Sequence, residues 1–203
     1  MRAGAALPKD GSGWTELGPG NIGGRTLALV IDPAHPSTMY AGTADGGVWK
    51  TTDGGQQWDT VGDLLPSLAV GSLVMDPTNS SILYAGTGEG AFNVDSVRGA
   101  GVFQTVDAGE HWTQVPGTDT PDFYFVNRMM ISNKTGRLYA ATSTGVWLFD
   151  AGAGHWTKTL TPHTLLGCFD LALRNDASGN DASSAKHPTD ETQNGRTEGS
   201  TAG

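Results

Sequence analysis

The stretch TTDGGQQW, from Thr51 to Trp58, places one acidic residue, two glycines and a tryptophan within eight residues. A closely related phrase, TVDAGEHW, runs from Thr105 to Trp112. Similar phrases end at Trp14 (GSGW) and Trp156 (AGHW), so that the four tryptophans lie 44, 54 and 44 residues apart. Self-similarity at a fixed period indicates a repeat architecture in which each repeat forms one supersecondary unit.

Each repeat contains four short apolar runs separated by turn residues. In the first repeat the runs are TLALVI, TMYAGT, VWKTT and WDTV, and the segments between them are DPAHPS, ADGG and DGGQQ. Runs rich in Val, Ile, Thr, Tyr and Trp predict β-strands, and no segment has a 3.6-residue apolar period long enough for a helix. Four strands in about 40 to 45 residues are typical of a β-propeller blade. A β-sandwich is the alternative, although it does not require so regular a period.

The repeats also predict the domain boundaries. Residues 1–13 are expected to form a flexible N-terminus, residues 14–176 the propeller blades and residues 177–203 a disordered polar tail. This tail has no Val, Ile, Leu, Met, Phe, Tyr, Trp or Cys, and cannot bury enough apolar surface to fold. The repeats cover about 14–58, 58–112 and 112–156, a fourth begins within 157–176, and the second contains an insertion, Ala91 to Ala100.

Three repeats and the first strand of a fourth are fewer than the roughly four to eight blades of most propellers. The sequence therefore predicts a partial ring with exposed sheet faces and edges at its two ends. One hypothesis is that it is the N-terminal piece of a longer propeller. If the chain is complete, two copies are expected to associate and close the ring.

The composition narrows the functional classes. With 12 Lys and Arg against 21 Asp and Glu, the formal net charge of −9 disfavours nucleic acid and anionic membrane surfaces as partners. No stretch approaches the roughly 18 consecutive apolar residues of a membrane span, and the first residues lack the apolar core of a signal peptide. The single Cys168 excludes an internal disulfide and a multi-cysteine metal site. We expect no cofactor and no metal.

The pattern Ser/Thr-x-Asp-x-Gly-x-x-Trp resembles the Asp-box, or BNR, repeat of sialidases, xyloglucan-cleaving glycosidases, sortilin-type receptors and many bacterial propellers. The resemblance covers about Trp14 to Asp176. It implies a β-propeller that is secreted or displayed at the cell surface, whereas the sequence carries no signal peptide. The third copy, LFDAGAGHW, departs from the pattern because Trp156 comes one residue late. We expect a loosened turn there.

The repeated acid has a structural interpretation. The motif joins the third and fourth strands of each unit, where a short acid can accept backbone N–H groups across its own turn and glycine supplies a positive φ. A catalytic acid is needed once rather than in every blade. A calcium loop is the alternative, but it needs several oxygen ligands, and DGGQQ offers one carboxylate. The residues with this expected structural role are Thr51, Asp53, Gly55, Trp58, Thr105, Asp107, Gly109, Trp112, Asp150, Gly152 and Trp156.

Successive turns of a four-stranded meander alternate between two ends, so the Asp-box turns share one end of the propeller. The opposite end, which we call the link face, collects the turns between second and third strands, the links between blades and the insertion. Long loops on a rigid scaffold are where binding sites usually lie. The side chains expected on this face are Arg25, Asp45, Glu89, Phe92, Asp95, Arg98, Asp122, Phe123, Tyr124 and Arg128. For each of them a solvated loop residue is the alternative interpretation.

Carboxylates, arginines and aromatic rings together fit sugar or peptide recognition. The first hypothesis is therefore a binding module for polysaccharide or polypeptide, with these ligand-binding residues: Arg25, Phe92, Asp95, Arg98, Tyr124 and Arg128. The alternative is an N-terminal fragment of a xyloglucanase-like or sialidase-like glycoside hydrolase with an incomplete active site.

Glycoside hydrolysis needs two carboxylates beside the scissile bond, and Asp45 and Glu89 are the candidate catalytic acids. In the phrase TADGG, Ala44 holds the position that an acid occupies in the xyloglucan-cleaving relatives. The phrase GGRTLAL lacks the Arg-Ile-Pro that a sialidase resemblance would require. Both departures weaken the enzyme hypotheses.

Overall fold

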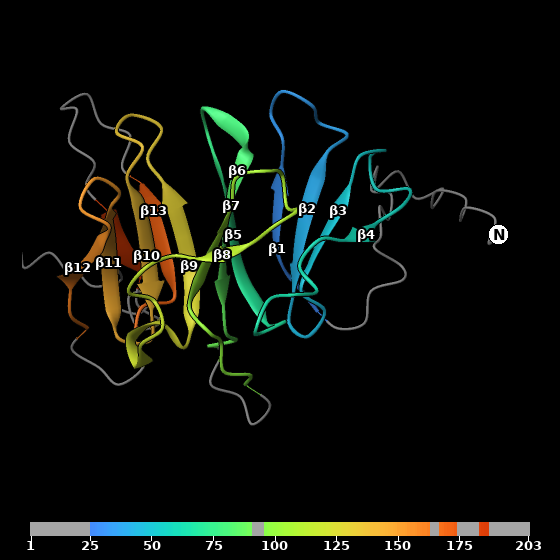
Figure 1. The fold of residues 1–203 in the computed structure, drawn as a ribbon. Coiled ribbons are helices and arrows are strands. Elements are labelled where there is room, and N and C mark those ends of the chain that lie inside the picture. Colours follow the sequence, from blue (N-terminus) through green and yellow to red (C-terminus); the bar gives the residue numbers. More distant parts are fainter. Residues whose placement is uncertain (1–24, 91–95, 163–166, 174–182, 187–203) are drawn as a thin grey trace, which may run out of the picture.

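The structure is a computed structural model, which describes residues 25–90, 96–162, 167–173 and 183–186 (Figure 1). Within these residues it contains strands and one 3-10 turn, η1 (Pro121–Phe123). Three antiparallel sheets of four strands each follow one another along the chain, and we call them blades 1, 2 and 3. No described helix is long and apolar enough to cross a membrane.

The spatial order of the strands in each blade is their order in the sequence, so each blade is an up-and-down meander. Blade 1 consists of β1 (Thr26–Ile31), β2 (Met39–Thr43), β3 (Val48–Thr51) and β4 (Asp59–Thr60). Blade 2 consists of β5 (Val70–Asp76), β6 (Asn79–Thr87), β7 (Val102–Thr105) and β8 (Thr113–Gln114). Blade 3 consists of β9 (Val126–Ile131), β10 (Leu138–Thr142), β11 (Gly145–Asp150) and β12 (His155–Leu160).

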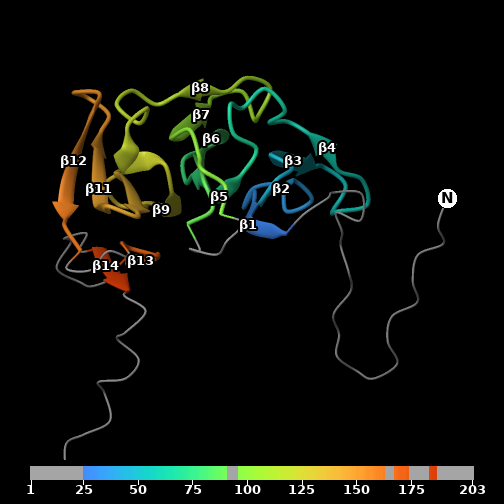
Figure 2. The same cartoon turned by 90° about the horizontal axis from the view of Figure 1, so that it is seen from below.

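The blades are arranged as a fan. In Figure 2, β4, β8 and β12 lie along the outside of the fan, while β1, β5 and β9 lie on its inner side. The inner strands are neighbours, because β5 contacts both β1 and β9. The prediction of four-stranded propeller blades in an incomplete ring is therefore confirmed, and the β-sandwich alternative is wrong.

A further sheet of two strands, β13 (Asp170–Leu173) and β14 (Ser183–Lys186), follows blade 3. Strand β13 contacts β9 and takes the place of the first strand of the next blade. Strand β14 lies in the segment expected to be a disordered tail, so the structure differs from that expectation at these four residues. Strand pairing uses backbone N–H and C=O groups, which a polar composition does not remove.

The core is divided among the spaces between the blades. Tyr40 and Val48 of blade 1 pack with Leu73 and Phe103 of blade 2. Between blades 2 and 3 lies a second cluster that includes Val102, Phe123, Met129 and Leu138. A third cluster joins Tyr139 and Val146 of blade 3 to Cys168 and Leu171. Because side chains alternate between the two faces of a strand, each blade contributes one face to each neighbour.

Candidate functional site

The turns between the third and fourth strands of blades 1 and 2 are closed by the same type of side chain, an aspartate. In blade 1 Asp53 Oδ1 accepts the backbone N–H groups of Gln56 (2.9 Å) and Gln57 (3.0 Å) and the hydroxyl of Thr51 (2.8 Å). These bonds stabilise the ionised carboxylate, and they lower the pKa of Asp53. The hydroxyl of Thr51 also binds within the turn, because its Oγ1 accepts the N–H of Gly55 at 3.0 Å.

In blade 2 Asp107 repeats this pattern. It accepts the His111 backbone N–H at 2.9 Å and the Thr105 hydroxyl at 2.7 Å, and its other oxygen lies 2.8 Å from His111 Nδ1. The N–H bond from His111 and the hydroxyl bond from Thr105 hold the pKa of Asp107 far below its usual range. The oxygens of these acids that accept hydrogen bonds thus bind groups of their own turn.

The turn of blade 3 is built differently. Asp150 accepts the N–H groups of Gly152 (2.9 Å) and Ala153 (3.0 Å), and the Gly154 N–H returns to the Asp150 carbonyl at 2.7 Å. The bond from Ala153, ahead of the other causes, lowers the pKa of Asp150. The expected loosened turn is instead a compact turn of four residues between long strands. The extra residue moves Trp156 into β12, directly opposite Phe149.

The link face begins with a buried threonine at the end of the second strand of each blade. Thr43 Oγ1 accepts the Gly46 N–H at 2.8 Å, and Thr142 Oγ1 accepts the Thr144 N–H at 3.2 Å. In blade 2 the equivalent Thr87 Oγ1 accepts the Ala100 N–H at 2.8 Å and donates to the Gly101 carbonyl at 2.7 Å. Hydrogen bonds to the same threonine therefore hold the two ends of the insertion together, and the strands of blade 2 keep the arrangement of the other blades.

The base of the insertion is packed into the blade. The Glu89 N–H donates to the Val97 carbonyl (2.9 Å), and the Gly99 N–H donates to the Tyr124 carbonyl (2.8 Å). A Cβ atom at Gly99 would lie 2.4 Å from the backbone nitrogen of Gly88, so this crossing needs glycine. Phe92 and Asp95, two of the predicted ligand-binding residues, lie outside the described residues.

Glu89 and Arg25 form an ion pair between blades 2 and 1. The Glu89 side chain is only 5% exposed, whereas Arg25 is 59% exposed. A buried carboxylate needs a charged or hydrogen-bonding partner, and the guanidinium of Arg25 supplies it. This candidate catalytic acid is thus engaged as a tie between the two blades.

Asp45 occupies the position in blade 1 that Glu89 occupies in blade 2, two residues after the buried threonine. Its side chain is exposed and makes no hydrogen bond or ion pair with the described residues. The backbone around it is fixed, because the Ala44 N–H donates to the Arg25 carbonyl at 2.9 Å. The two candidate acids therefore lie at equivalent positions with opposite surroundings.

Arg98 and Tyr124 form the second element of the link face. The Arg98 guanidinium carbon lies 3.5 Å from the centre of the Tyr124 ring. The Arg98 carbonyl accepts the Ser67 hydroxyl at 3.3 Å, which ties this residue to the link between blades 1 and 2. Arg98 is exposed and has no carboxylate within ion-pair distance among the described residues, so its N–H donors are available to a ligand.

The remaining predicted residues separate into two groups. Arg128 and Asp122 each form an ion pair at the surface. Arg128 Nε lies 3.6 Å from Asp170 Oδ1, and Asp122 Oδ1 lies 3.4 Å from Lys158 Nζ. Phe123 is 1% exposed and packs against Trp147 and Trp156. The expectation that its side chain lies on the link face is wrong, because η1 turns this ring into the core between blades 2 and 3.

Asn127 is a link-face residue that no sequence pattern indicated. Its Nδ2 donates to the Cys168 carbonyl at 2.7 Å, and a Cβ at Gly90 would lie 2.0 Å from its Oδ1. Asn127 therefore joins the insertion base to the segment after blade 3. The sequence signal that could have indicated Asn127 was the adjacent Arg128, which was predicted as a site residue at the end of the same link between blades 2 and 3.

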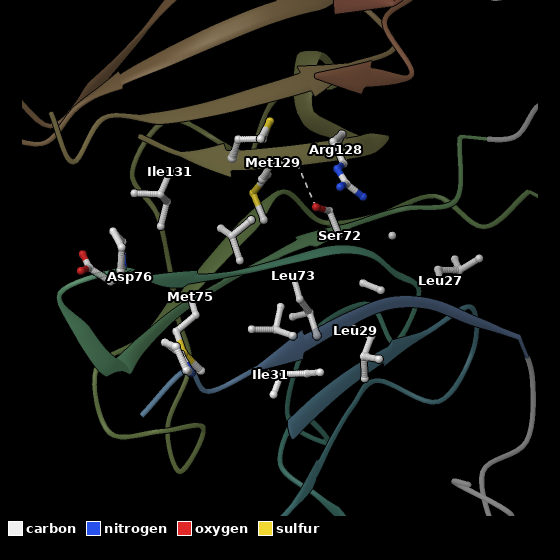
Figure 3. Close-up of a pocket in the computed structure, with 17 residues that line it drawn as sticks. Leu27, Leu29, Ile31, Ser72, Leu73, Met75, Asp76, Arg128, Met129 and Ile131 are labelled. Carbon is white, nitrogen blue, oxygen red and sulfur yellow. Dashed lines mark hydrogen bonds between the residues drawn. The ribbon is translucent and has the colours of Figure 1, made fainter. Parts of the chain in front are cut away.

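A groove of about 430 Å³ runs along the inner strands of all three blades (Figure 3). Its walls carry aliphatic and thioether side chains such as Leu29, Leu73 and Met129, with Arg128 at one end and Asp76 at the other.

Among the described residues no group of three His, Cys, Asp or Glu side chains could hold a metal ion.

No family profile matches the chain. The chain is 29% identical to a xyloglucanase of Hypocrea jecorina (strain QM6a) over an alignment of 172 residues. This alignment covers 70% of this chain and 20% of that relative. The chain thus spans about a fifth of the length of this curated relative.

Solved structures share the fold. A GH74 xyloglucanase from Xanthomonas campestris superimposes with a TM-score of 0.55 at 22% identity, covering 67% of this chain and 21% of that one. A GH74 enzyme from Niastella koreensis gives a TM-score of 0.51 at 24% identity, covering 65% and 21%. An auxiliary nutrient binding protein from Bacteroides thetaiotaomicron gives 0.56 at 16% identity, covering 77% and 35%. The chain is a β-propeller segment whose sequence is similar to part of a xyloglucanase.

Proposed function

We propose that this chain forms part of a polysaccharide-acting propeller of the glycoside hydrolase type, and that its link face contacts the polysaccharide. The single observation that carries this proposal is the 29% identity to a xyloglucanase across 70% of the chain. We further propose that the phrases at Trp58, Trp112 and Trp156 are Asp-box repeats, and that the protein works outside the cytoplasm.

The contact surface proposed within the link face comprises Arg25, Asp45, Arg98, Tyr124 and Arg128. Arg98 offers N–H donors from a fixed position above Tyr124, and Asp45 offers an unpaired carboxylate from a fixed turn. Hydroxyl groups of a sugar can donate to a carboxylate and accept from a guanidinium. A polypeptide ligand, which the same groups could also recognise, is the competing possibility.

Catalysis by this chain alone is not expected. Hydrolysis of a glycosidic bond needs two carboxyl groups about 5 to 10 Å apart. Of the two candidates, Glu89 is buried against Arg25 and only Asp45 faces solvent. We therefore propose that this chain supplies binding and at most one of the two acids.

A binding experiment with soluble xyloglucan tests the proposal. Affinity electrophoresis or calorimetry should detect binding by the wild-type chain, and Asp45→Asn and Arg98→Ala should each weaken it several-fold. Glu110→Gln is the matched control, because Glu110 is an exposed acid in the Asp-box turn at the opposite end. Binding that is absent, or that falls equally in Glu110→Gln, would contradict the proposed surface.

A hydrolysis assay on xyloglucan separates binding from catalysis. We expect no release of reducing sugar by the chain alone. Turnover that disappears in Asp45→Asn or Glu89→Gln would instead show that the chain contains a complete active site.

A further inference from the structure

The described base of the insertion in blade 2 is fixed by two backbone hydrogen bonds. The Glu89 N–H donates to the Val97 carbonyl at 2.9 Å, and the Gly99 N–H donates to the Tyr124 carbonyl at 2.8 Å. Arg98 lies between Val97 and Gly99 in the chain, and its guanidinium carbon lies 3.5 Å from the centre of the Tyr124 ring. The position of the Arg98 side chain therefore depends on these two bonds staying closed.

The side chain of Glu89 ties this base to blade 1. It forms an ion pair with Arg25, the residue that immediately precedes β1. The Arg25 carbonyl accepts the Ala44 N–H at 2.9 Å, so the backbone of Arg25 is itself fixed to blade 1. The ion pair thus connects two hydrogen-bonded networks, one in each blade.

The two partners of this ion pair differ in their exposure. Glu89 is 5% exposed, and a buried carboxylate without a partner is unfavourable because it has given up its hydration. Arg25 is 59% exposed, so its guanidinium stays hydrated when the carboxylate is absent. Loss of the Arg25 charge should therefore drive Glu89 towards water and open the base further than loss of the Glu89 charge does.

The same position of blade 3 also makes a tie. Thr144, like Glu89, comes two residues after the buried threonine at the end of the second strand. Its hydroxyl donates to the Asp122 carbonyl at 3.3 Å, in the link before blade 3. An ion pair takes this place in blade 2, and charge-assisted hydrogen bonds are about twice as strong as neutral ones. The stronger tie thus lies in the blade that carries the insertion.

We infer that Glu89 and Arg25 are positioning residues, whose ion pair keeps the base of the insertion closed and so holds Arg98 above Tyr124 for contact with the polysaccharide. Glu89 acts through Arg98 and does not itself touch the ligand. The polysaccharide contact rests on the proposed function, whereas the closing of the base does not. A second tie, the 3.3 Å bond from the Ser67 hydroxyl to the Arg98 carbonyl, is neutral and exposed, so it contributes less.

Amide hydrogen exchange followed by NMR, without any ligand, tests the closing of the base. Exchange at Gly99 reports on opening, because its N–H is bonded to Tyr124 only while the base is closed. Glu89→Gln should speed this exchange about tenfold, and Arg25→Gln should speed it further. Glu110→Gln is the matched control, because it makes the same change at an exposed acid in the turn at the opposite end. Unchanged exchange at Gly99 in either variant, or equal acceleration throughout blade 2, would overturn the proposal.

Binding to xyloglucan then tests whether the closed base acts through Arg98. Glu89→Gln should weaken binding several-fold in the wild-type background and should have no further effect in the Arg98→Ala background. Equal effects in both backgrounds would show that Glu89 contributes independently of Arg98, and would contradict the positioning role. If the wild-type chain binds no xyloglucan, the proposed function fails together with the ligand contact of Arg98, and the exchange result alone decides whether the ion pair closes the base.

Discussion

At the scale of single residues, the clearest local strain lies at Ala108. Its φ of 58° is the only positive value among the non-glycine residues described, and the repeat-equivalent residue of blade 1 is Gly54, with φ of 75°. The left-handed region brings the Cβ of an alanine close to the following carbonyl oxygen. The Ala108 carbonyl accepts both the Tyr40 hydroxyl (3.1 Å) and Lys50 Nζ (3.0 Å), and a glycine at this position would keep both bonds.

Exchanging these two residue types should give opposite results. Ala108→Gly should stabilise the protein by about 0.5 kcal/mol, because relief of the left-handed strain exceeds the entropy that glycine adds to the unfolded chain. Gly54→Ala should destabilise it by about 1 kcal/mol, although a Cβ there meets no atom within 4 Å. Urea unfolding of both variants measures the effect. Destabilisation by both would show that the Ala108 junction requires the methyl group.

The acid of the blade 2 turn predicts a pH dependence. The pKa of Asp107 is lowered in the folded protein, chiefly by the His111 N–H and the Thr105 hydroxyl. A lowered folded pKa gives stability that is complete above the unfolded value of about 4 and is lost as the pH falls below it. The difference in unfolding free energy between wild type and Asp107→Asn should therefore be largest near pH 5 and shrink from about pH 4 to about pH 2.

Chemical unfolding in this pH range checks the prediction below the region in which histidine titrates. Asp45→Asn is the control, since the Asp45 side chain makes no bond with the described residues. If the stability difference for Asp107→Asn did not change with pH, the carboxylate would not be closing the turn.

At the scale of elements, the tryptophans that follow the turns between third and fourth strands have different roles in blades 2 and 3. Trp112 Nε1 donates to the Val61 carbonyl at 2.6 Å, which joins blade 2 to the link that follows blade 1. For Trp156 of blade 3, the equivalent acceptor would be the carbonyl of Val115 in the link that follows blade 2. That carbonyl accepts the Thr118 hydroxyl at 2.8 Å instead. Trp156 Nε1 is buried without a partner among the described residues. The extra turn residue of blade 3 thus removed one hydrogen bond between blades.

Replacing each tryptophan by phenylalanine separates the bond from the ring. Trp112→Phe should cost about 1 kcal/mol more than Trp156→Phe, because only the former leaves a carbonyl without its donor. Thermal unfolding of the two variants provides the comparison, in which the loss of ring area is the same. Equal costs would mean that the Trp112 bond contributes nothing net.

At the scale of the whole molecule, the position of a blade in the fan determines how much an apolar side chain contributes to the free energy of unfolding. Leu73 and Leu29 hold equivalent positions of blades 2 and 1, but they are 6% and 58% exposed. Leu73→Ala should destabilise the monomer by about 2 to 4 kcal/mol, because a cavity opens between two blades. Leu29→Ala should cost less than about 1 kcal/mol. Urea unfolding of the two variants tests the pair, and similar costs would show that β1 is covered in solution.

Much of the fold could be predicted because blade signals are local. The apolar runs from TLALVI onward became strands, and the repeat of Thr-x-Asp-x-Gly-x-x-Trp marked the turns between third and fourth strands. The bonds that close those turns join residues two to four positions apart, such as Thr51 with Asp53 and Asp107 with His111. Strand β14 was not predicted, because its sequence SSAK has none of the β-branched or aromatic residues by which the other strands were recognised.

From the sequence, the candidate site could be predicted only as a position at one end of the propeller, and the contacts between its residues could not be predicted. Arg25 and Glu89 are 64 positions apart, so no local pattern announces their ion pair. Phe123 was expected among the side chains of the link face, and η1 turns its ring into the core. The side chains of loops are placed by the neighbouring blades, and the sequence of one loop does not contain that information.

The sequence by itself determined the blade period, the strand positions and the end of each blade at which the repeated acids lie, because these depend on side chains within a few residues. The tertiary structure alone decided which carboxylate is buried and which is open, as Glu89 and Asp45 show at equivalent positions. It also decided that Leu73 is core while Leu29 is surface. The physical reason is that burial depends on whether a second blade covers the first, and that is a property of the assembled fan.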